Sequence, residues 1–203
     1  YNGPYQNLTG CDGVGDTPYT IIDTNNKDHY PLMKPYPYSI DVTVTNVTLS
    51  KTVVFIGYRL LINVTVENQG CFTETFNITI YGQWEPPSIP IGTITVLNLS
   101  SGETRIVTGT CNTTVLSIGY YMIIAVADIV PRETDIEDNT FVDSQLRISK
   151  RGDLNLDGVV NYKDASIFRL AYIGEYNYLA DFNQDGVINY KDASLFRGYY
   201  IAG

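Results

Sequence analysis

The sequence predicts a mainly β protein, in which a two-sheet β-sandwich lies between an irregular N-terminal arm and a small helical C-terminal domain. Residues 1–37 are rich in Gly, Pro, Asp and Asn and lack a regular apolar period, which is typical of turns and irregular chain. Residues 38–149 alternate apolar and polar side chains, as half-buried strands do. Residues 150–203 contain one segment twice, in which apolar side chains recur at helical spacing.

Composition and charge limit the class of partner. The chain has 203 residues and a net charge of −9, so a nucleic-acid backbone would repel it, and divalent cations are its natural ligands. No apolar run approaches the roughly 20 residues of a membrane helix, so no membrane span is expected in this chain. The chain starts at Tyr1 without a basic-then-apolar leader, which indicates a mature or processed segment.

The composition favours an extracellular or cell-surface location. Tyr, Thr and Asn are abundant while Lys, Arg and His are scarce, which suits β-sheets with hydroxyl-rich outer faces. Asn-x-Ser/Thr triplets mark candidate N-glycosylation sites, and Asn63 and Asn77 fall on solvent faces of predicted strands. Chance occurrence in an Asn- and Thr-rich sequence is the alternative. The acceptors are Asn7, Asn46, Asn63, Asn77, Asn98 and Asn112.

The chain contains three cysteines, Cys11, Cys71 and Cys111, which allow at most one intrachain disulfide. Cys71 precedes the third predicted strand and Cys111 ends the fifth, so three strand traversals place them at opposite poles of the sandwich. An intrachain disulfide, if one forms, is therefore expected to involve Cys11. A leftover thiol could pair between chains or stay buried and free.

Part of the predicted arm resembles a known family. The string DGVGDTPY (Asp12 to Tyr19), followed by DHYPLM (Asp28 to Met33), resembles the closing segment of NosD-like right-handed β-helix surface proteins. The solenoid repeats that would precede this segment are absent from the sequence. The resemblance implies either cleavage from a longer precursor or a family tail that is reused on its own.

Seven strands are predicted between residues 38 and 149, at a spacing that is typical of an immunoglobulin-like sandwich. In the first of them, Val42 and Val44 are expected to point into the core while Thr43 and Thr45 point to solvent. The strands are predicted at Ile40–Val44, Ile62–Val66, Phe76–Ile80, Ile91–Leu97, Thr104–Thr110, Tyr120–Ala127 and Thr140–Ile148.

Two phrases of the predicted sandwich resemble the CARDB family, whose members are adhesion-type β-sandwiches of bacterial and archaeal surface proteins. They are NVTVENQG, from Asn63 to Gly70, and ETDIEDNT, from Glu133 to Thr140. The resemblance implies a spacer or adhesive module without catalytic residues.

Oxygen donors recur at positions 1, 3, 5, 9 and 12 of two loops in the C-terminal segment, which is the spacing of an EF-hand calcium loop. Gly158 and Gly186 at position 6 permit the sharp turn, and Val159 and Val187 at position 7 are expected to offer main-chain carbonyls. A solvated acidic turn is the alternative. The side-chain donors are Asp153, Asn155, Asp157, Asn161 and Asp164 in the first loop, and Asp181, Asn183, Asp185, Asn189 and Asp192 in the second.

Position 12 is Asp in both loops, whereas a regulatory EF-hand has Glu, and no amphipathic helix precedes either loop. In both respects residues 150–203 resemble the dockerin family, whose half-EF-hands have only the exiting helix. The resemblance implies a module with two calcium ions and two helices. Helical spacing predicts a core between antiparallel helices from Ala165, Ile167, Phe168 and Tyr172, and from Ala193, Leu195, Phe196 and Tyr200.

Dockerins recognise a cohesin partner through side chains on these helices, and the duplication lets either copy face the partner. The resemblance alone makes six exposed positions candidate partner contacts, and exposed charge without a partner is the alternative. The candidates are Tyr162, Lys163, Arg169, Tyr190, Lys191 and Arg197.

The sequence offers no set of catalytic residues, so no enzyme activity is expected. His29 is the single histidine, which leaves Ser-His-Asp triads and multi-histidine zinc sites incomplete. The acidic residues of the arm are interpreted as Asx-turns, with an additional calcium site as the alternative. The cluster before the last strand is interpreted as a solvated loop, with a weak cation site as the alternative. These two groups are Asp12, Asp16, Asp23 and Asp28, and Glu133, Asp135, Glu137, Asp138 and Asn139.

These observations predict a non-enzymatic extracellular protein that makes calcium-stabilised protein–protein contacts. In the first hypothesis, identical subunits associate through the arm, an open sandwich edge or the C-terminal module into a surface filament or sheath. In the second, the module docks to a separate cohesin. A third reading, a carbohydrate-binding accessory of a hydrolase, depends only on surface aromatics such as Trp84.

Overall fold

The computed structural model describes residues 19–20, 27–28 and 39–202. Most of the predicted arm therefore lies outside the described residues, and so do Asn7, Cys11 and His29. Within the arm, β1 (Tyr19–Thr20) pairs antiparallel with β2 (Lys27–Asp28).

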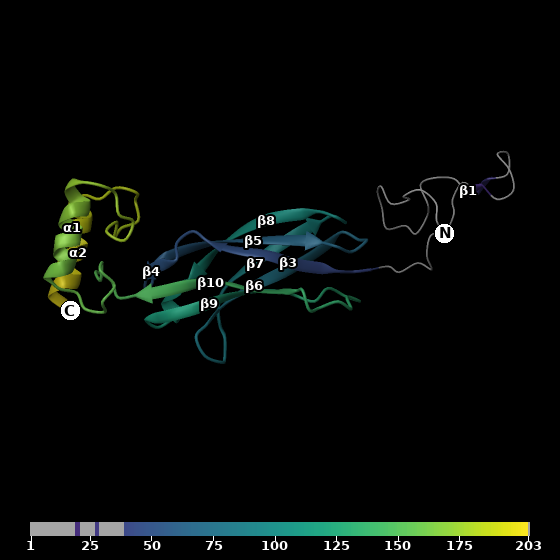
Figure 1. Cartoon of the computed structure of the whole chain (residues 1–203), viewed down its shortest axis with the longest axis horizontal. Helices are drawn as coiled ribbons and strands as arrows, with labels where there is room; N and C mark the ends of the chain where they lie inside the picture. The colour runs from purple at the N-terminus through teal and green to yellow at the C-terminus, as the bar shows by residue number, and fades with distance from the viewer. Residues whose placement is uncertain (1–18, 21–26, 29–38, 203) are drawn as a thin grey trace.

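The predicted mainly β fold is confirmed, and the strands form two packed sheets (Figure 1). One sheet has the order β3-β5-β8 and the other has the order β4-β10-β9-β6-β7. In the described sheets, β4 and β10 pair in parallel, and the other neighbours are antiparallel. The strands are β3 (Val42–Leu49), β4 (Val53–Phe55), β5 (Arg59–Asn68), β6 (Glu74–Gln83), β7 (Ile89–Leu99), β8 (Thr104–Asn112), β9 (Gly119–Ala127) and β10 (Thr140–Ser149).

The prediction of seven sandwich strands is wrong, because β4 forms an eighth within the described sandwich. After β3 the chain crosses from the three-stranded to the five-stranded sheet, where Val53–Phe55 pair with Arg147–Ser149. This segment reads Val-Val-Phe, with Val54 and Phe55 both buried. It is short and does not alternate, so it lacks the period-2 signal of a half-buried strand.

Alternation was predicted correctly for β5 but fails in β3. Ile62, Val64 and Val66 are all fully buried, as predicted. In β3 a register shift between Val44 and Asn46 changes the face that the following residues occupy, so that Val47 enters the core. Thr43, which was expected to face solvent, is buried, and its hydroxyl donates to the carbonyl oxygen of Asp138 at 3.1 Å.

The side of the sandwich formed by β7 and β8 is partly closed by one arginine. From β8, the Arg105 guanidinium donates to the carbonyl oxygens of Leu97 and Asn98, at 2.7 and 3.1 Å. The same guanidinium is held by the carboxylate of Glu103. Carbonyl groups at this end of the β7 edge are therefore already hydrogen-bonded, which disfavours addition of a foreign strand there.

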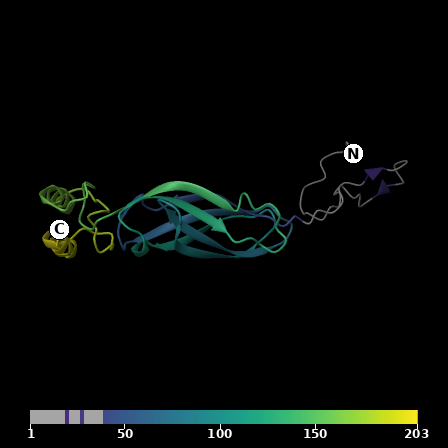
Figure 2. The same cartoon turned by 90° about the horizontal axis from the view of Figure 1, so that it is seen from below.

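The sandwich has two poles, which β10 connects. One, called here the distal pole, contains the start of β3 and the connection 128–139 that precedes β10, and the helical module follows the other end of β10 (Figures 1 and 2). Ten extended residues span about 33 Å, so surfaces at the two poles are far apart.

The connection at the distal pole is only partly the solvated loop that was predicted. Asp135 and Glu137 are exposed, but Glu133 and Asn139 are buried. The Glu133 carboxylate accepts hydrogen bonds from the backbone N–H groups of Val42 and Val130 and from the Asn139 amide, at 2.8 to 3.0 Å. Glu133 therefore ties this connection to the start of β3.

The cysteines follow the expectation that Cys71 and Cys111 do not pair. Cys71 is disulfide-bonded, whereas Cys111 is free and buried. The predicted partner Cys11 lies outside the described residues. Burial raises the pKa of the Cys111 thiol to about 12, which keeps it protonated and unreactive at neutral pH.

Two helices follow the sandwich, α1 (Tyr162–Ile173) and α2 (Tyr190–Ala202). Each begins at position 10 of one of the predicted oxygen-donor loops, so the position-12 aspartate lies in the first turn of the helix. Across the part of the chain that the structure describes, no helix has the length and apolar character that a membrane span would need.

Candidate functional site

The first oxygen-donor loop is organised around Asp153, at position 1, whose side chain is fully buried. One carboxylate oxygen accepts from the N–H of Asp157 at 3.0 Å. The other accepts from the N–H of Gly158 at 3.0 Å and from the Ser149 hydroxyl at 2.9 Å. Asp153 thus folds the loop around itself and attaches it to the last residue of β10.

The second loop repeats this arrangement with one change of partner. The Asp181 carboxylate accepts from the N–H groups of Asp185 and Gly186, at 3.2 and 2.8 Å. In place of a serine, the hydroxyl of Tyr176 donates to it at 2.9 Å. Burial, followed by this bond to Asp181, raises the pKa of Tyr176 to about 12.

Positions 3 and 5 form successive turns in both loops. The Asn155 side chain accepts from the N–H of Asp157 at 3.1 Å, and the Asp157 side chain accepts from the N–H of Val159 at 3.0 Å. Asn183, Asp185 and Val187 repeat these bonds, each at 3.0 Å. At position 6, Gly158 and Gly186 have φ of 90° and 84°, which a residue with a side chain adopts only under strain.

Asp157 is ionised at neutral pH. Hydrogen bonds from the Asn155 amide and from the Val159 N–H hold the pKa of its carboxyl below the usual range. The ammonium of Lys163 lies 3.7 Å from this carboxylate, and Lys191 lies 3.9 Å from Asp185 in the second copy.

Asp164, at position 12, closes the first loop and starts α1. Its fully buried carboxylate accepts from the N–H groups of Leu154, Asn155 and Asn161, at 2.8, 3.0 and 2.8 Å. The bond to Asn161 is half of a capping box that satisfies free N–H groups at the helix start. In the second copy, Asp192 accepts from Asn183 and Asn189.

The structure thus gathers each predicted set of donors in one loop, and these sets consist entirely of oxygens, which suits a hard divalent cation. Within the described residues, no three His, Cys, Asp or Glu side chains already form a metal-binding group. Two of the five side-chain donors in each loop are asparagines, and a main-chain carbonyl would add to them, so carboxylates alone do not make up either set.

The helices pack through an aromatic core that agrees only in part with the prediction. Phe168 and Phe196 are buried and stack with ring centroids 5.0 Å apart. Tyr172 and Tyr200, predicted as core residues, keep 45% and 44% of their surface exposed. They contact Phe168 and Phe196 from the rim of the core. Leu195 is likewise 38% exposed rather than buried.

Sequence reasoning missed the contact between the helical module and the sandwich. The Phe182 ring stacks on Phe168, on Phe196 and on Phe55 of β4, with centroid distances of 5.8, 5.7 and 5.9 Å. Tyr199 packs edge-on against Phe182 at 5.4 Å. One signal could have revealed this contact, because the two copies differ here: the first has Leu154 and Ala171 where the second has Phe182 and Tyr199.

Polar contacts reinforce this junction. The Arg147 guanidinium donates to the Tyr120 hydroxyl at 2.9 Å and to the carbonyl oxygen of Leu156 inside the first loop. The Arg151 guanidinium donates to the Ile56 carbonyl at 2.9 Å and lies over the ring of Tyr58. The bonds Arg147–Leu156 and Ser149–Asp153 therefore fix the first loop to the sandwich, and Arg151 fixes the residues that precede the loop.

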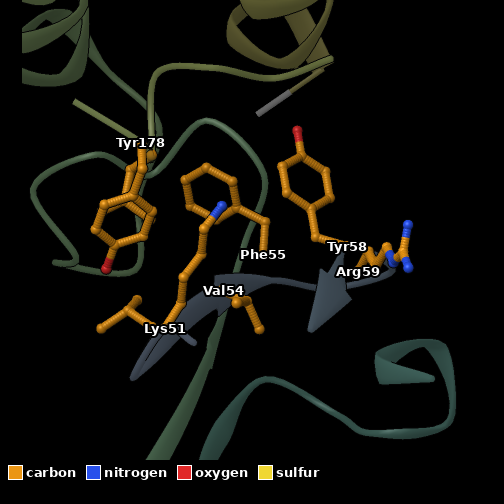
Figure 3. Close-up of a pocket in the computed structure, with 8 residues that line it drawn as sticks. Lys51, Val54, Phe55, Tyr58, Arg59 and Tyr178 are labelled. Atoms are coloured by element: carbon orange, nitrogen blue, oxygen red, sulfur yellow. The ribbon is translucent and has the colours of Figure 1, made fainter. Parts of the chain in front are cut away.

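A small recess lies at the same junction and is lined by Lys51, Phe55 and Tyr178, among others (Figure 3). The Lys51 ammonium lies over the Tyr178 ring, 5.1 Å from its centroid. Figure 3 shows the Tyr58 hydroxyl and the Arg59 guanidinium directed away from Tyr178, so the polar groups do not converge on one point. The recess therefore lacks the arrangement of a ligand site.

The candidate partner residues and glycosylation acceptors are accessible. Tyr162 and Tyr190 are 70% and 72% exposed, and Lys163, Arg169, Lys191 and Arg197 are exposed as well. The acceptors Asn46, Asn63, Asn77, Asn98 and Asn112 are all exposed. The predicted solvent-facing positions of Asn63 and Asn77 are thus confirmed.

Comparison with known proteins adds little to this description. No family model matches the chain, and no curated protein matches it. Among solved structures, a CARDB domain from Pyrococcus furiosus, in complex with di-metal ions, shares 20% identity over 56% of this chain and 96% of that chain, with a TM-score of 0.44.

Two β-glucosidases resemble this chain about as much as the CARDB domain does. The enzyme from Erythrobacter marinus shares 14% identity over 54% of this chain and 15% of that chain, with a TM-score of 0.40. The enzyme from Listeria innocua shares 18% identity over 64% of this chain and 18% of that chain, with a TM-score of 0.39. The matched region is thus a small part of each enzyme, and likeness of this degree assigns no function.

Proposed function

We propose that the chain is a non-enzymatic extracellular structural or adhesive protein whose C-terminal dockerin-like module binds two calcium ions and makes protein–protein contacts. The repetition of one hydrogen-bonded loop carries the proposal. In both loops the carboxylates at positions 1 and 5 accept hydrogen bonds from corresponding backbone N–H groups. Both loops also have glycine at position 6, where φ is positive.

Calcium would supply the positive charge that these loops lack. Each loop has three Asp carboxylates, and Lys163 or Lys191 approaches only one of them. A divalent cation bound by six or seven oxygens would offset the repulsion between these carboxylates. The first site would use Asp153, Asn155, Asp157, Asn161, Asp164 and the Val159 carbonyl, and the second Asp181, Asn183, Asp185, Asn189, Asp192 and the Val187 carbonyl.

The proposed partner is a protein, either an identical subunit or a cohesin-like domain. The carbonyl groups of Leu97 and Asn98 on the β7 edge are already hydrogen-bonded to Arg105, so the partner is not expected to add a strand at that position. Contacts through the helices are more favourable, because the outer side chains of the helices are exposed and rich in tyrosine and arginine. These residue types dominate protein interfaces.

Calcium titration tests the proposal. Two calcium ions per chain are expected in calorimetry, with a gain of helical circular dichroism. Asp157→Ala should remove one of the two sites, because the second loop shares no side chain with the first. The exposed Asp135→Ala, which lies at the distal pole, is the matched control and should leave both sites intact. A stoichiometry of zero for the unmodified protein would refute calcium binding.

Glycosylation tests the extracellular location. Asn63 and Asn77 are exposed on strands whose opposite faces pack the core, so protein from its natural host should have glycans at both positions. Mass spectrometry of tryptic peptides measures the occupancy. Unmodified peptides at both positions would remove this support for an extracellular address.

A further inference from the structure

The distal pole concentrates negative charge. Burial raises the pKa of Asp41, and the nearby carboxylates of Asp138, Asp135, Glu133 and Glu67 raise it further. Buried oxygens of Asp41 and Asp138 have no hydrogen-bond partner within the described residues. This pole is therefore a surface on which a positively charged partner would relieve electrostatic repulsion.

Apolar side chains accompany these charges at the distal pole. Ile129 and Ile136 are 62% and 48% exposed within the same connection. Exposed Asp135 and Glu137 flank Ile136 in the sequence. The surface thus combines acidic groups with large exposed apolar groups, which is a feature of interaction sites.

The opposite end of the molecule offers the complementary combination. In α1, Arg169, Leu170 and Ile173 lie on one face by their spacing of three and four residues, and Arg197 and Ile201 repeat it in α2. Leu170, Ile173 and Ile201 are 66%, 70% and 72% exposed. Within the described residues, neither arginine is part of an ion pair. These five side chains are called here the helical face.

Calcium would change the charge of this end. Residues 150–203 contain six Lys and Arg and seven Asp and Glu, a net charge of −1, while residues 1–149 have a net charge of −8. Two calcium ions would add four positive charges and bring the module to +3. Ligation of Asp157 and Asp185 would also release Lys163 and Lys191 from their present ion pairs.

We infer that the helical face of one copy binds the distal pole of a second copy, so that calcium-loaded chains associate head to tail. The partner is an identical chain because the required acidic and apolar surface is present on this molecule, about one strand length away from the helical module. Since the two surfaces differ and lie at opposite poles, the contact is heterologous and leads to open filaments rather than closed dimers. This inference rests on the proposed calcium-binding function and names its partner.

Charge reversal on each surface tests the inference. Arg169→Glu with Arg197→Glu should reduce association in calcium at least ten-fold, measured by sedimentation velocity at low ionic strength. Asp135→Lys with Glu137→Lys should do the same, because each reversed surface then meets a surface of like charge. Increasing salt should weaken association of the unmodified protein.

Mixing provides the decisive result. A one-to-one mixture of the two double variants should associate again, because the reversed helical face of one matches the reversed distal pole of the other. The control variants Arg59→Glu and Glu85→Lys change exposed charges elsewhere and should associate like the unmodified protein. Failure of the mixture to recover, or a monomer at all concentrations, would overturn the inference.

Calcium calorimetry on the same samples separates the two proposals. A chain that binds two calcium ions but stays monomeric contradicts only the head-to-tail contact and favours a separate cohesin-like partner. A chain that binds no calcium contradicts the proposed function itself. Association that is equal with calcium and with chelator would contradict the calcium dependence of the contact.

Discussion

Replacement of Phe182 by alanine is expected to lower the free energy of unfolding of the C-terminal module by about 3–5 kcal/mol, the usual cost of removing a buried phenylalanine. Phe182 is 4% exposed. Its ring is the link between Phe55 of the sandwich and the Phe168–Phe196 pair of the helices. Removing it leaves a cavity at the place where the two parts of the molecule meet.

Chemical denaturation followed by circular dichroism at a helical wavelength measures this effect in saturating calcium. The unmodified protein should lose helix and sandwich together, whereas Phe182→Ala should lose helix first. Ile106→Ala is the control, because Ile106 is 67% exposed and its truncation should change stability by less than about 0.5 kcal/mol. Equal midpoints for Phe182→Ala and the unmodified protein would show that the aromatic stack does not couple the two parts.

Replacement of Asp164 by alanine is expected to destabilise the first loop in the calcium-free protein, and not only to remove a calcium ligand. Three backbone N–H groups, of Leu154, Asn155 and Asn161, would lose their common acceptor. A buried donor without a partner costs about 1–3 kcal/mol, which applies to the N–H of Leu154, while the part-buried N–H groups of Asn155 and Asn161 add a smaller cost. The side chain at position 12 is thus predicted to be structural as well as a calcium ligand.

A comparison of two variants in chelator separates these roles. Asp157→Ala removes a partly exposed side chain, so in chelator its stability should stay close to that of the unmodified protein. Asp164→Ala should be strongly destabilised under the same conditions, and calcium should restore little of the loss. If both variants were equally stable in chelator, the hydrogen bonds of Asp164 would not contribute to the free energy of unfolding.

The sequence was most informative where local chemistry decides the structure. The alternation along β5 follows from the two-residue period of a strand. The spacing of donors in the two loops follows from a turn that a few neighbouring residues determine. The missed features depend on contacts between distant segments. β4 exists because Val53–Phe55 find a partner in the last strand, and Glu133 is buried because it meets the N–H of Val42.

The junction between sandwich and module shows the same limit. Phe182 follows the first aspartate of the second loop, and nothing in the helical period marks it as a core residue. Only the difference from Leu154 in the first copy distinguishes it. The helical core was mispredicted at Tyr172 and Tyr200 for a related reason, because Phe182 fills the space between the helices.

The parallel pairing of β4 with β10 has a mechanical consequence. The chain enters the sandwich at the distal pole through β3 and leaves it at the helical module through β10. Tension between neighbours in a chain of molecules would first load β3 against its partner β5 and, once β3 yields, would pull β4 and β10 in opposite directions along their axes. Hydrogen bonds between paired strands lie across this direction, and they would be loaded in shear and share the force rather than opening one after another. The same order of strands that builds the fold thus places a second resistance to stretching between its last strand and the short strand that follows β3.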